Sequence, residues 1–267
     1  MKVKILGIGG FGNIGLPFNS FLINDHVLVD TPPDILQSLY RESVNFDDID
    51  TIVLTHYHGD HYFGLPFLLF QYYEKHKNGK YEKCKDGETH KGSDAAKTLT
   101  IAGPAQLRSK VQEILSLAIA PDHPYVDWCL ENIVFREIDA TAHLEWADGS
   151  WMRFTRSAHT VETYSILSGE GNEDLKPLFV ATSDTRWDPA LKALALQGPR
   201  LLLCDCNGEG FGGVHLSPEE VANYLLPLVG QETSLVATHV SREMPEKHRK
   251  FPYGTLEFAS CGEVFTL

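Results

Sequence analysis

Short apolar runs separated by turn residues recur along this chain, and several are followed by stretches with the apolar spacing of a helix. Runs rich in Val, Ile, Leu and Phe, bounded by Gly, Pro, Asn or Asp, predict strands. We expect a hairpin over 20–30 and strands at 51–55, 99–102, 132–138, 151–157, 163–168, 177–182, 200–205 and 234–238. We expect helices at 34–41, 65–76, 106–120, 188–196 and 217–229.

The start of the chain carries five glycines between positions 7 and 15, like a dinucleotide-binding loop. Such a loop needs a helix directly after the glycines, because the helix N-terminus holds the pyrophosphate. Here Pro17 and a hairpin with an Asn24-Asp25 turn come next instead. The sequence therefore excludes a nucleotide-binding fold and favours a glycine-rich loop beside a cleft.

Strands alternate with helices along the chain, and no internal period or linker divides it. This order predicts a mixed α/β layered fold in a single domain over residues 1–267. Residues 77–97 are polar, contain glycine and mix both charges, which is typical of an exposed insertion.

The most informative segment is residues 55–61, which read Thr-His-Tyr-His-Gly-Asp-His directly after an apolar strand. Successive side chains of an extended segment point to opposite faces, so His56 and His58 share one side and can reach one ion. The glycine that follows lets the chain turn, which brings Asp60 and His61 in from another direction. Imidazoles bind zinc and similar divalent ions strongly, and a carboxylate compensates charge. The segment predicts a metal site.

Three later residues could complete this site. His159, Asp184 and His239 each stand at the end of a predicted apolar strand. Catalytic groups of layered α/β proteins collect at strand ends. Taken alone, each residue has a simpler explanation as a cap or turn residue. Together with the first cluster, they favour metal ligation.

The order His-x-His-x-Asp-His, then His, then Asp, then His resembles the motif of the metallo-β-lactamase superfamily and spans almost the whole chain. Residues 29–33 (VDTPP) and the Gly103-Pro104 pair also match that family's pattern. The resemblance implies an α/β (α+β) layered fold, an αββα sandwich with metals at one edge of two packed β-sheets.

The resemblance also implies two divalent ions and a role for each candidate ligand. The first ion would be held by His56, His58 and His159. The second would be held by Asp60, His61 and His239, with Asp184 bridging both. Asp30 is similar to a family aspartate that supports the ligand loop. These residue types suit Zn²⁺, and they also suit Mn²⁺ or iron.

His215 helps to indicate the class of substrate. In the ribonuclease Z and phosphodiesterase-like branch, a similarly placed histidine donates a proton to the leaving oxygen or binds the phosphate. A phosphodiester has a poor alkoxide leaving group, so a general acid is useful. The resemblance therefore makes Asp60 and His215 the candidate catalytic residues. The alternative for His215 is an idle, exposed histidine near an N-cap.

The chain also departs from ribonuclease Z. That family pairs its histidine with a glutamate three residues before the bridging aspartate, where this chain has Ala181. Asp205 is a candidate substitute partner. The interval from His159 to Asp184 is too short for the long arm that grips transfer RNA. These gaps disfavour processing of transfer RNA and favour a smaller phosphodiester.

Charge and composition limit the kinds of partner that we expect for the protein. The net charge is −13 and no cluster of four Lys or Arg residues occurs, so a large nucleic acid would be repelled. We expect no membrane span and no secretory signal. Five cysteines without a regular framework indicate reduced thiols and a cytoplasmic location. We expect Cys204 and Cys206 to be buried structural residues rather than metal ligands.

These observations favour a binuclear, zinc-dependent hydrolase that acts on a small-molecule substrate, a cyclic nucleotide or other cyclic phosphate. Two divalent ions about 3.5–4 Å apart can share a water and lower its pKa to produce hydroxide. A lactone or thioester hydrolase of the same fold is the alternative. A di-iron oxidoreductase and a metal-binding protein without catalysis are further alternatives. The resemblance is also compatible with a homodimer, because members of the family often form dimers.

Overall fold

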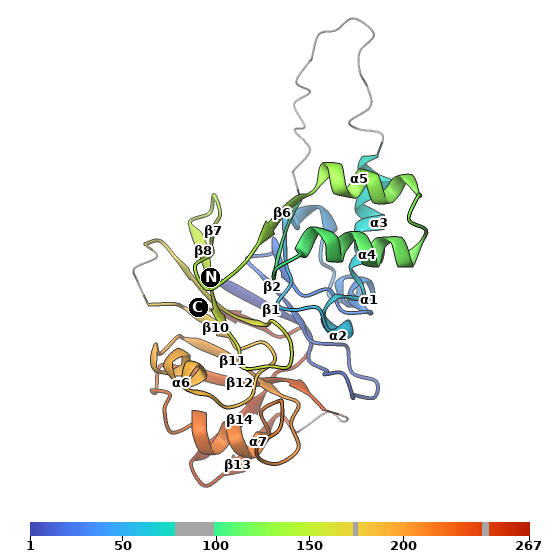
Figure 1. Cartoon of the computed structure of the whole chain (residues 1–267). Helices are drawn as coiled ribbons and strands as arrows, with labels where there is room; N and C mark the ends of the chain where they lie inside the picture. The colour runs from blue at the N-terminus through green and yellow to red at the C-terminus, as the bar shows by residue number, and fades with distance from the viewer. Residues whose placement is uncertain (78–98, 173–175, 242–245) are drawn as a thin grey trace, which may run out of the picture.

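The computed structural model describes residues 1–77, 99–172, 176–241 and 246–267 (Figure 1). The insertion predicted at 77–97 lies, apart from its first residue, outside this part of the chain. Among the helices of the described ranges, none is long and apolar enough to cross a membrane.

Two β-sheets form the centre of the molecule. The first has the strand order β15 (Val264–Thr266), β1 (Lys2–Gly7), β2 (Ser20–Ile23), β3 (Val27–Val29), β4 (Thr51–Val53), β5 (Thr100–Gly103) and β6 (Val134–Glu137). The second has the order β13 (His248–Phe251), β14 (Gly254–Phe258), β12 (Ser234–Val240), β11 (Leu201–Cys206), β10 (Phe179–Ala181), β9 (Tyr164–Glu170), β8 (Ser150–Arg156) and β7 (His143–Glu145). Strands β3 to β6 pair in parallel, as do β10, β11, β12 and β14.

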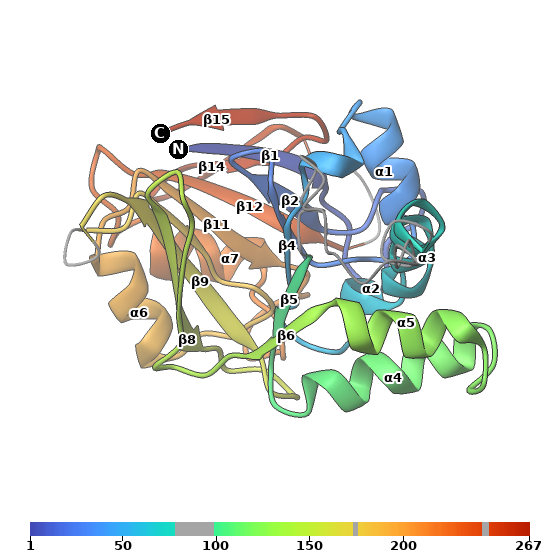
Figure 2. The same cartoon turned by 90° about the horizontal axis from the view of Figure 1, so that it is seen from above.

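Helices cover the outer face of each sheet (Figure 2). The first sheet carries α1 (Ile35–Arg41), α2 (Gly59–Tyr62), α3 (Leu65–His76), α4 (Leu107–Ala118) and α5 (Pro124–Asn132), with a short 3₁₀ turn η1 (Phe46–Asp48). The second carries α6 (Pro189–Leu196) and α7 (Pro218–Glu220), which continues as the π-helix η2 (Val221–Leu225). The αββα sandwich predicted from the sequence is confirmed.

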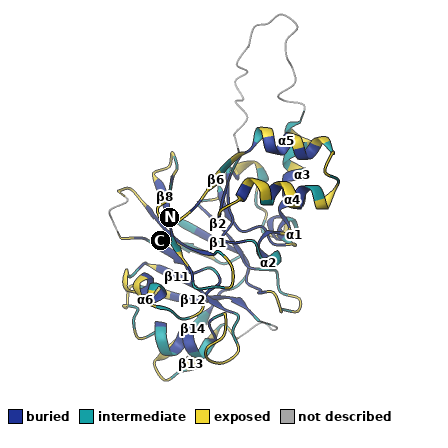
Figure 3. Ribbon diagram, viewed as in Figure 1, coloured by how far each residue is buried: buried dark blue, intermediate teal, exposed yellow. Residues whose placement is uncertain are grey.

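The apolar runs are continuous because central strands are buried on both faces. In β4, Ile52 packs with the helices outside the first sheet, whereas Val53 packs in the layer between the sheets. The rings of Phe21 and Phe179 meet edge-on between the sheets, with centroids 5.4 Å apart. Figure 3 shows the central strands of both sheets among the most deeply buried parts of the chain, whereas the edge strands β6, β13 and β15 are largely exposed or half-buried.

Most of the expected elements are present, with bounds that differ by a few residues. Helix α3 covers the predicted range 65–76, and the predicted hairpin turns at Asn24 and Asp25, whose φ angles are 48° and 61°. Such left-handed pairs match the twist of the flanking strands. The predicted helix 217–229 is shorter, because it changes to a π-helix that ends at Leu225.

Helix α5 was not among the predicted elements. Pro124 opens this helix, and the His123 side chain accepts a hydrogen bond from the backbone N–H of Tyr125. Proline at the first helical position is common because its missing N–H has no partner there. Strands β1, β7, β13, β14 and β15 were also not predicted from the sequence.

At the edge of the sandwich where β3 and β4 begin, His26 joins the two sheets. Its Nδ1 lies 3.1 Å from Oδ1 of Asp50, and its Nε2 lies 3.3 Å from Oδ2 of Asp148 in the β7–β8 turn. The ring also meets Trp146 edge-on. Only an imidazolium can donate to both carboxylates. The hydrogen bond to Asp50 raises the pKa of His26, although burial partly opposes it.

We therefore expect His26 to stabilise the fold in a pH-dependent manner. A group whose pKa is raised by folding contributes fully below its unfolded pKa of 6.5, and that contribution is lost as the pH rises through the folded pKa. The unfolding midpoint of His26→Gln should fall below that of the parent protein at acidic pH and approach it at alkaline pH. Urea unfolding of chelator-treated protein across this range measures the difference. His248→Gln, on the exposed strand β13, is the control, and an equal gap at all pH values would contradict the expectation.

Candidate metal centre

The predicted cluster lies where β4 ends and α2 begins. The chain stays extended through His58, with φ −71° and ψ 150°, and becomes helical at Gly59. A Cβ at Gly59 would lie 2.8 Å from the exposed Phe63 ring, so a larger residue at this position would require that ring to move. As expected, His56 and His58 lie on one side, with ring centroids 4.7 Å apart.

The first group of candidate ligands joins this cluster to the ends of two strands of the second sheet. It consists of His56, His58, His159 and Asp184, whose potential ligand atoms lie within 4.8 Å of one another. Nε2 of His159 lies 3.2 Å from Nδ1 of His58. Oδ2 of Asp184 lies 3.6 Å from Nε2 of His56 and 3.7 Å from Nε2 of His159.

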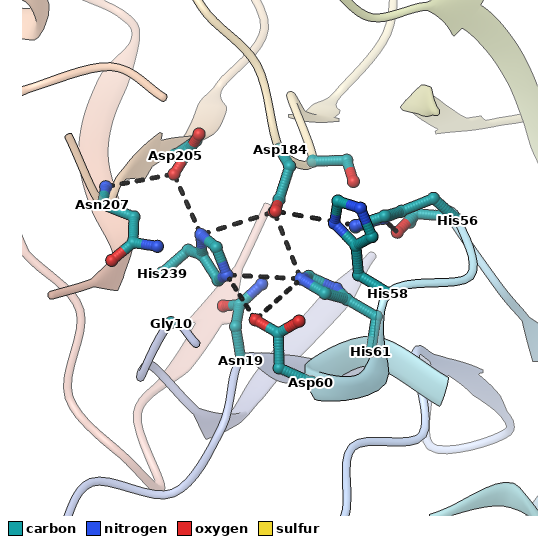
Figure 4. Close-up of polar contacts among 12 residues, drawn as sticks. Gly10, Asn19, His56, His58, Asp60, His61, Asp184, Asp205, Asn207 and His239 are labelled. Atoms are coloured by element: carbon teal, nitrogen blue, oxygen red, sulfur yellow. Dashed lines mark hydrogen bonds and ion pairs between the residues drawn. The ribbon is translucent and has the colours of Figure 1, made fainter. Parts of the chain in front are cut away.

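The second group consists of Asp60, His61 and His239 (Figure 4). Oδ2 of Asp60 lies 3.2 Å from Nε2 of His239 and 3.6 Å from Nε2 of His61. The other oxygen of Asp184, Oδ1, lies 3.2 Å from Nε2 of His61. Asp184 therefore faces the first group with one oxygen and the second group with the other.

Hydrogen bonds on the outer side of the rings orient the histidines. Nδ1 of His61 lies 2.7 Å from Oδ2 of Asp30, and Nδ1 of His239 lies 3.0 Å from Oδ1 of Asp205. Nδ1 of His159 lies 3.3 Å from the carbonyl oxygen of Val214. Since these partners can only accept, each Nδ1 carries a proton. Each Nε2 can then give its lone pair to a cation at the centre.

This arrangement fits a bound cation. Nε2 of His56 is buried and has no hydrogen-bond partner, which is costly unless another group binds it. Nε2 of His61 and Nε2 of His239 face each other at 3.2 Å, and their lone pairs would repel without a positive charge nearby. Nitrogen-rich sites with carboxylate oxygens suit Zn²⁺ in particular.

The pKa values divide the centre into two parts. Burial lowers the pKa of His56, His58 and His159, so these rings are neutral and ready to ligate. Burial would also lower the pKa of His239, but the charge of Asp184 and the bonds to Asp205 and Asp60 outweigh it and raise the value to about 10. The carboxylates thus concentrate negative charge at the second group, where a metal cation can replace a proton.

Asp205 has a larger part than the sequence indicated. Its buried carboxylate lies 2.8 Å from Nδ1 of His215, which makes it the substitute partner expected for that histidine. It also orients His239 and accepts hydrogen bonds from the backbone N–H groups of Thr185 and Asn207. These bonds account for the proximity of Asp184, Asp205, His215 and His239 without a further ion. The signal for this role was a lone carboxylate within an otherwise apolar strand.

Tyr57, which stands between His56 and His58, and two cysteines lie outside the ligand groups. The Tyr57 hydroxyl donates a hydrogen bond to the carbonyl oxygen of Pro104, 2.7 Å away, so the ring packs at the edge of the site. Cys204 and Cys206 are buried in β11, and burial raises the pKa of both thiols. They are buried residues of the sheet, as the sequence favoured.

Known proteins resemble this chain in sequence and in structure. The sequence profile of a family described as "Anti-Pycsar protein Apyc1" matches residues 1–84. A protein named "Ribonuclease Z" from Clostridioides difficile (strain 630) is 29% identical over 159 residues, which cover 54% of this chain and 46% of that protein. The match thus spans less than half of the relative's length.

Two solved structures resemble the whole chain. The metallo-β-lactamase fold protein YhfI from Bacillus subtilis has a TM-score of 0.68 at 18% identity, covering 99% of this chain and 98% of that one. A diphosphatase from the PhnP family has a TM-score of 0.68 at 19% identity, covering 100% of this chain and 97% of that one. At such identities the likeness shows the fold alone.

If the two groups bind ions as their geometry favours, ligand substitutions should have graded effects on metal content. We expect about two ions per chain in the parent protein, about one in His58→Ala or Asp60→Ala, and fewer still in Asp184→Ala, which faces both groups. Elemental analysis of dialysed protein measures this. His248→Ala, outside every ligand group, should keep the full content. Full metal content in Asp184→Ala would show that this carboxylate is not a bridging ligand.

Proposed function

We propose that this chain, which has the metallo-β-lactamase fold and resembles ribonuclease Z in sequence, is a binuclear metal-dependent hydrolase of small phosphodiesters. The observation that carries the proposal is the position of Asp184 between two groups of ligands. One carboxylate that faces two cation sites is typical of centres that hold a pair of divalent ions. The donor set favours Zn²⁺, with Mn²⁺ or iron as alternatives.

Bound in these groups, two such ions would act as Lewis acids that activate a water and stabilise negative charge on the attacked group. We assign His56, His58 and His159 to the first ion and His61, Asp60 and His239 to the second, with Asp184 shared. Asp60 is buried, with 4% of its surface exposed, so its charge is poorly screened by solvent. As a ligand of the second ion, Asp60 would lie beside the activated water, and we propose it with His215 as a catalytic residue.

His215 is the proposed general acid. Its Nδ1–H donates to Asp205, which leaves Nε2 available to a substrate. Its ring centroid lies 5.0 Å from that of His159 and 5.4 Å from that of His239. Burial would lower its pKa, but the hydrogen bond and charge of Asp205 raise it. A raised pKa favours the form of the ring that carries a second proton. His215 can then protonate an alkoxide as it leaves.

The relatives and the charge of the chain support the substrate class. Ribonuclease Z and the diphosphatase are named for action on phosphate-containing substrates. The net charge of −13 and the lack of a basic cluster in the sequence favour a small anion over a long polyanion. A cyclic nucleotide or another cyclic phosphate meets both conditions. We further propose action in the cytoplasm by a single domain.

A substrate panel tests the proposal. We expect the metal-loaded protein to hydrolyse bis(p-nitrophenyl) phosphate and 2′,3′- or 3′,5′-cyclic nucleotides, and to lose both activities after chelation. Acyl lactones and thioesters should be poor substrates. Activity confined to these esters would contradict the phosphodiester assignment, and activity on none of the panel would contradict hydrolysis of either class.

The His215→Ala substitution tests whether His215 is the general acid. It should lower turnover of a cyclic nucleotide by about 10²- to 10⁴-fold, because the alkoxide leaves without a proton. Turnover of bis(p-nitrophenyl) phosphate should change much less, because nitrophenolate leaves unaided. Metal content, measured in parallel, should stay full. Equal losses on both substrates at full metal content would show that His215 is not the acid.

A further inference from the structure

The loop over 207–217 carries two groups of the proposed centre. His215 lies on it, and the carbonyl oxygen of Val214 lies 3.3 Å from Nδ1 of His159. Yet the loop contains four glycines, two of which, Gly210 and Gly212, have φ angles of 73° and 79°. A glycine-rich segment has many accessible conformations, so its position must be fixed by contacts from outside it.

Glu220 makes such contacts from the first turn of α7. Its side chain completes a capping box: Oε2 accepts a hydrogen bond from the N–H of Ser217 at 3.0 Å, and the Ser217 hydroxyl accepts one from the N–H of Glu220. A capping box needs only one carboxylate oxygen. Here the other oxygen, Oε1, accepts a hydrogen bond from the N–H of Gly212, at 2.9 Å.

The Glu220 carboxylate therefore spans the part of the loop that holds His215. Gly212 lies three positions before the histidine and Ser217 two positions after it. Only 4% of the surface of Glu220 is exposed. A buried carboxylate is costly unless its oxygens accept hydrogen bonds, so the two backbone N–H groups and the carboxylate hold one another in place.

Further contacts hold the same loop against the segment that carries Asp184. The N–H of Leu216 donates to the carbonyl oxygen of Thr185 at 2.9 Å. The Phe211 ring meets Tyr224 of the π-helix, and Tyr224 in turn packs on Trp187, with centroids 4.7 Å apart. These contacts hold the loop at Phe211 and Leu216. Among the described side chains, only that of Glu220 accepts hydrogen bonds from loop N–H groups on both sides of His215.

We propose that Glu220 is a positioning residue for the reaction, which holds His215 at the distance from the metal groups that proton donation requires. The inference rests on the proposed function, because it assumes that His215 is the general acid. Glu220 touches neither the metal groups nor the acid directly. It acts through the backbone of the loop, so its loss should affect the steps that depend on His215.

Glu219 provides a matched control. It is the neighbouring residue on the same helix turn, but it points outward and pairs with Arg249 at 2.8 Å on the exposed surface. Its substitution removes a carboxylate of the same size from the same turn without touching the loop. Exposed pairs of this kind contribute little to stability.

The test compares Glu220→Ala, Glu220→Gln and Glu219→Gln on two substrates with different leaving groups. In Glu220→Ala, turnover of a 3′,5′-cyclic nucleotide should fall by about 10- to 100-fold, since a small displacement of a catalytic group has effects of this order. Turnover of bis(p-nitrophenyl) phosphate should change by less than about threefold, because its leaving group needs no acid. The turnover of Glu220→Gln should lie between those of the parent protein and Glu220→Ala. The amide NH₂ group of glutamine cannot accept a hydrogen bond, so it would face one of the two backbone N–H donors unfavourably. Glu219→Gln should match the parent.

A double variant distinguishes a positioning role of Glu220 from a purely structural role. In the His215→Ala background, Glu220→Ala should cause no further loss on the cyclic nucleotide, because residues that act as a unit are not additive. Metal content and melting temperature are measured for every variant. If Glu220→Ala does not fold, the turnover of Glu220→Gln relative to that of Glu219→Gln on the two substrates tests the positioning role.

The outcomes separate the two proposals. If His215→Ala shows the leaving-group dependence but both Glu220 variants do not, the positioning role is wrong and the general acid stands. Equal losses on both substrates in the Glu220 variants, or a further loss in the double variant, also overturn the positioning role. If His215→Ala shows no leaving-group dependence, the general acid fails and the positioning role fails with it.

Discussion

The fold depends on a buried carboxylate that lies among imidazoles contributed by both halves of the chain. Asp184 is 2% exposed, and His61 and His239 lie close to one of its oxygens while His56 and His159 lie close to the other. Taking a charge out of water costs several kcal/mol unless opposite charges or hydrogen bonds compensate it. Compensation requires both sheets to deliver their strand ends to one edge, so the site and the sandwich architecture depend on each other.

That convergence is held by two further aspartates rather than by the ligands alone. Asp30 connects His61 to the backbone N–H of Thr55, and Asp205 connects His239 to the loop after β11. Three positions at this edge, Asp30, Ser183 and His239, have φ angles between 51° and 61°. Non-glycine residues rarely adopt such values, and they persist where surrounding contacts over-determine them. The ligand geometry is thus stabilised at the expense of local backbone strain.

The sequence predicted the elements that deliver the site, because apolar strands followed by His or Asp are visible in a single chain. It could not predict the second role of Asp205. That role depends on the parallel register that sets Asp205 beside Thr238, directly before His239, although 34 positions separate Asp205 from His239. The capping box at Ser217 was readable from its spacing, but the bond from Gly212 to the second oxygen of Glu220 was not. Helix α5 was not predicted, because a proline such as Pro124 can mark the end of one helix as well as the first residue of the next.

The surface charge and the site charge act over different distances. At physiological ionic strength the screening length is about 8 Å, so a small phosphodiester feels mainly the groups at the mouth of the centre once it is near. A long nucleic acid would extend over much of a protein surface whose net charge is −13, and would meet repulsion at many phosphates. In the proposed centre, bound cations would balance the carboxylates of the second ligand group. Any positive charge in excess of these carboxylates would be confined to one edge of the sandwich. An anion small enough to be held at that edge would avoid most of the unfavourable field, and this agrees with the compact substrate that we propose.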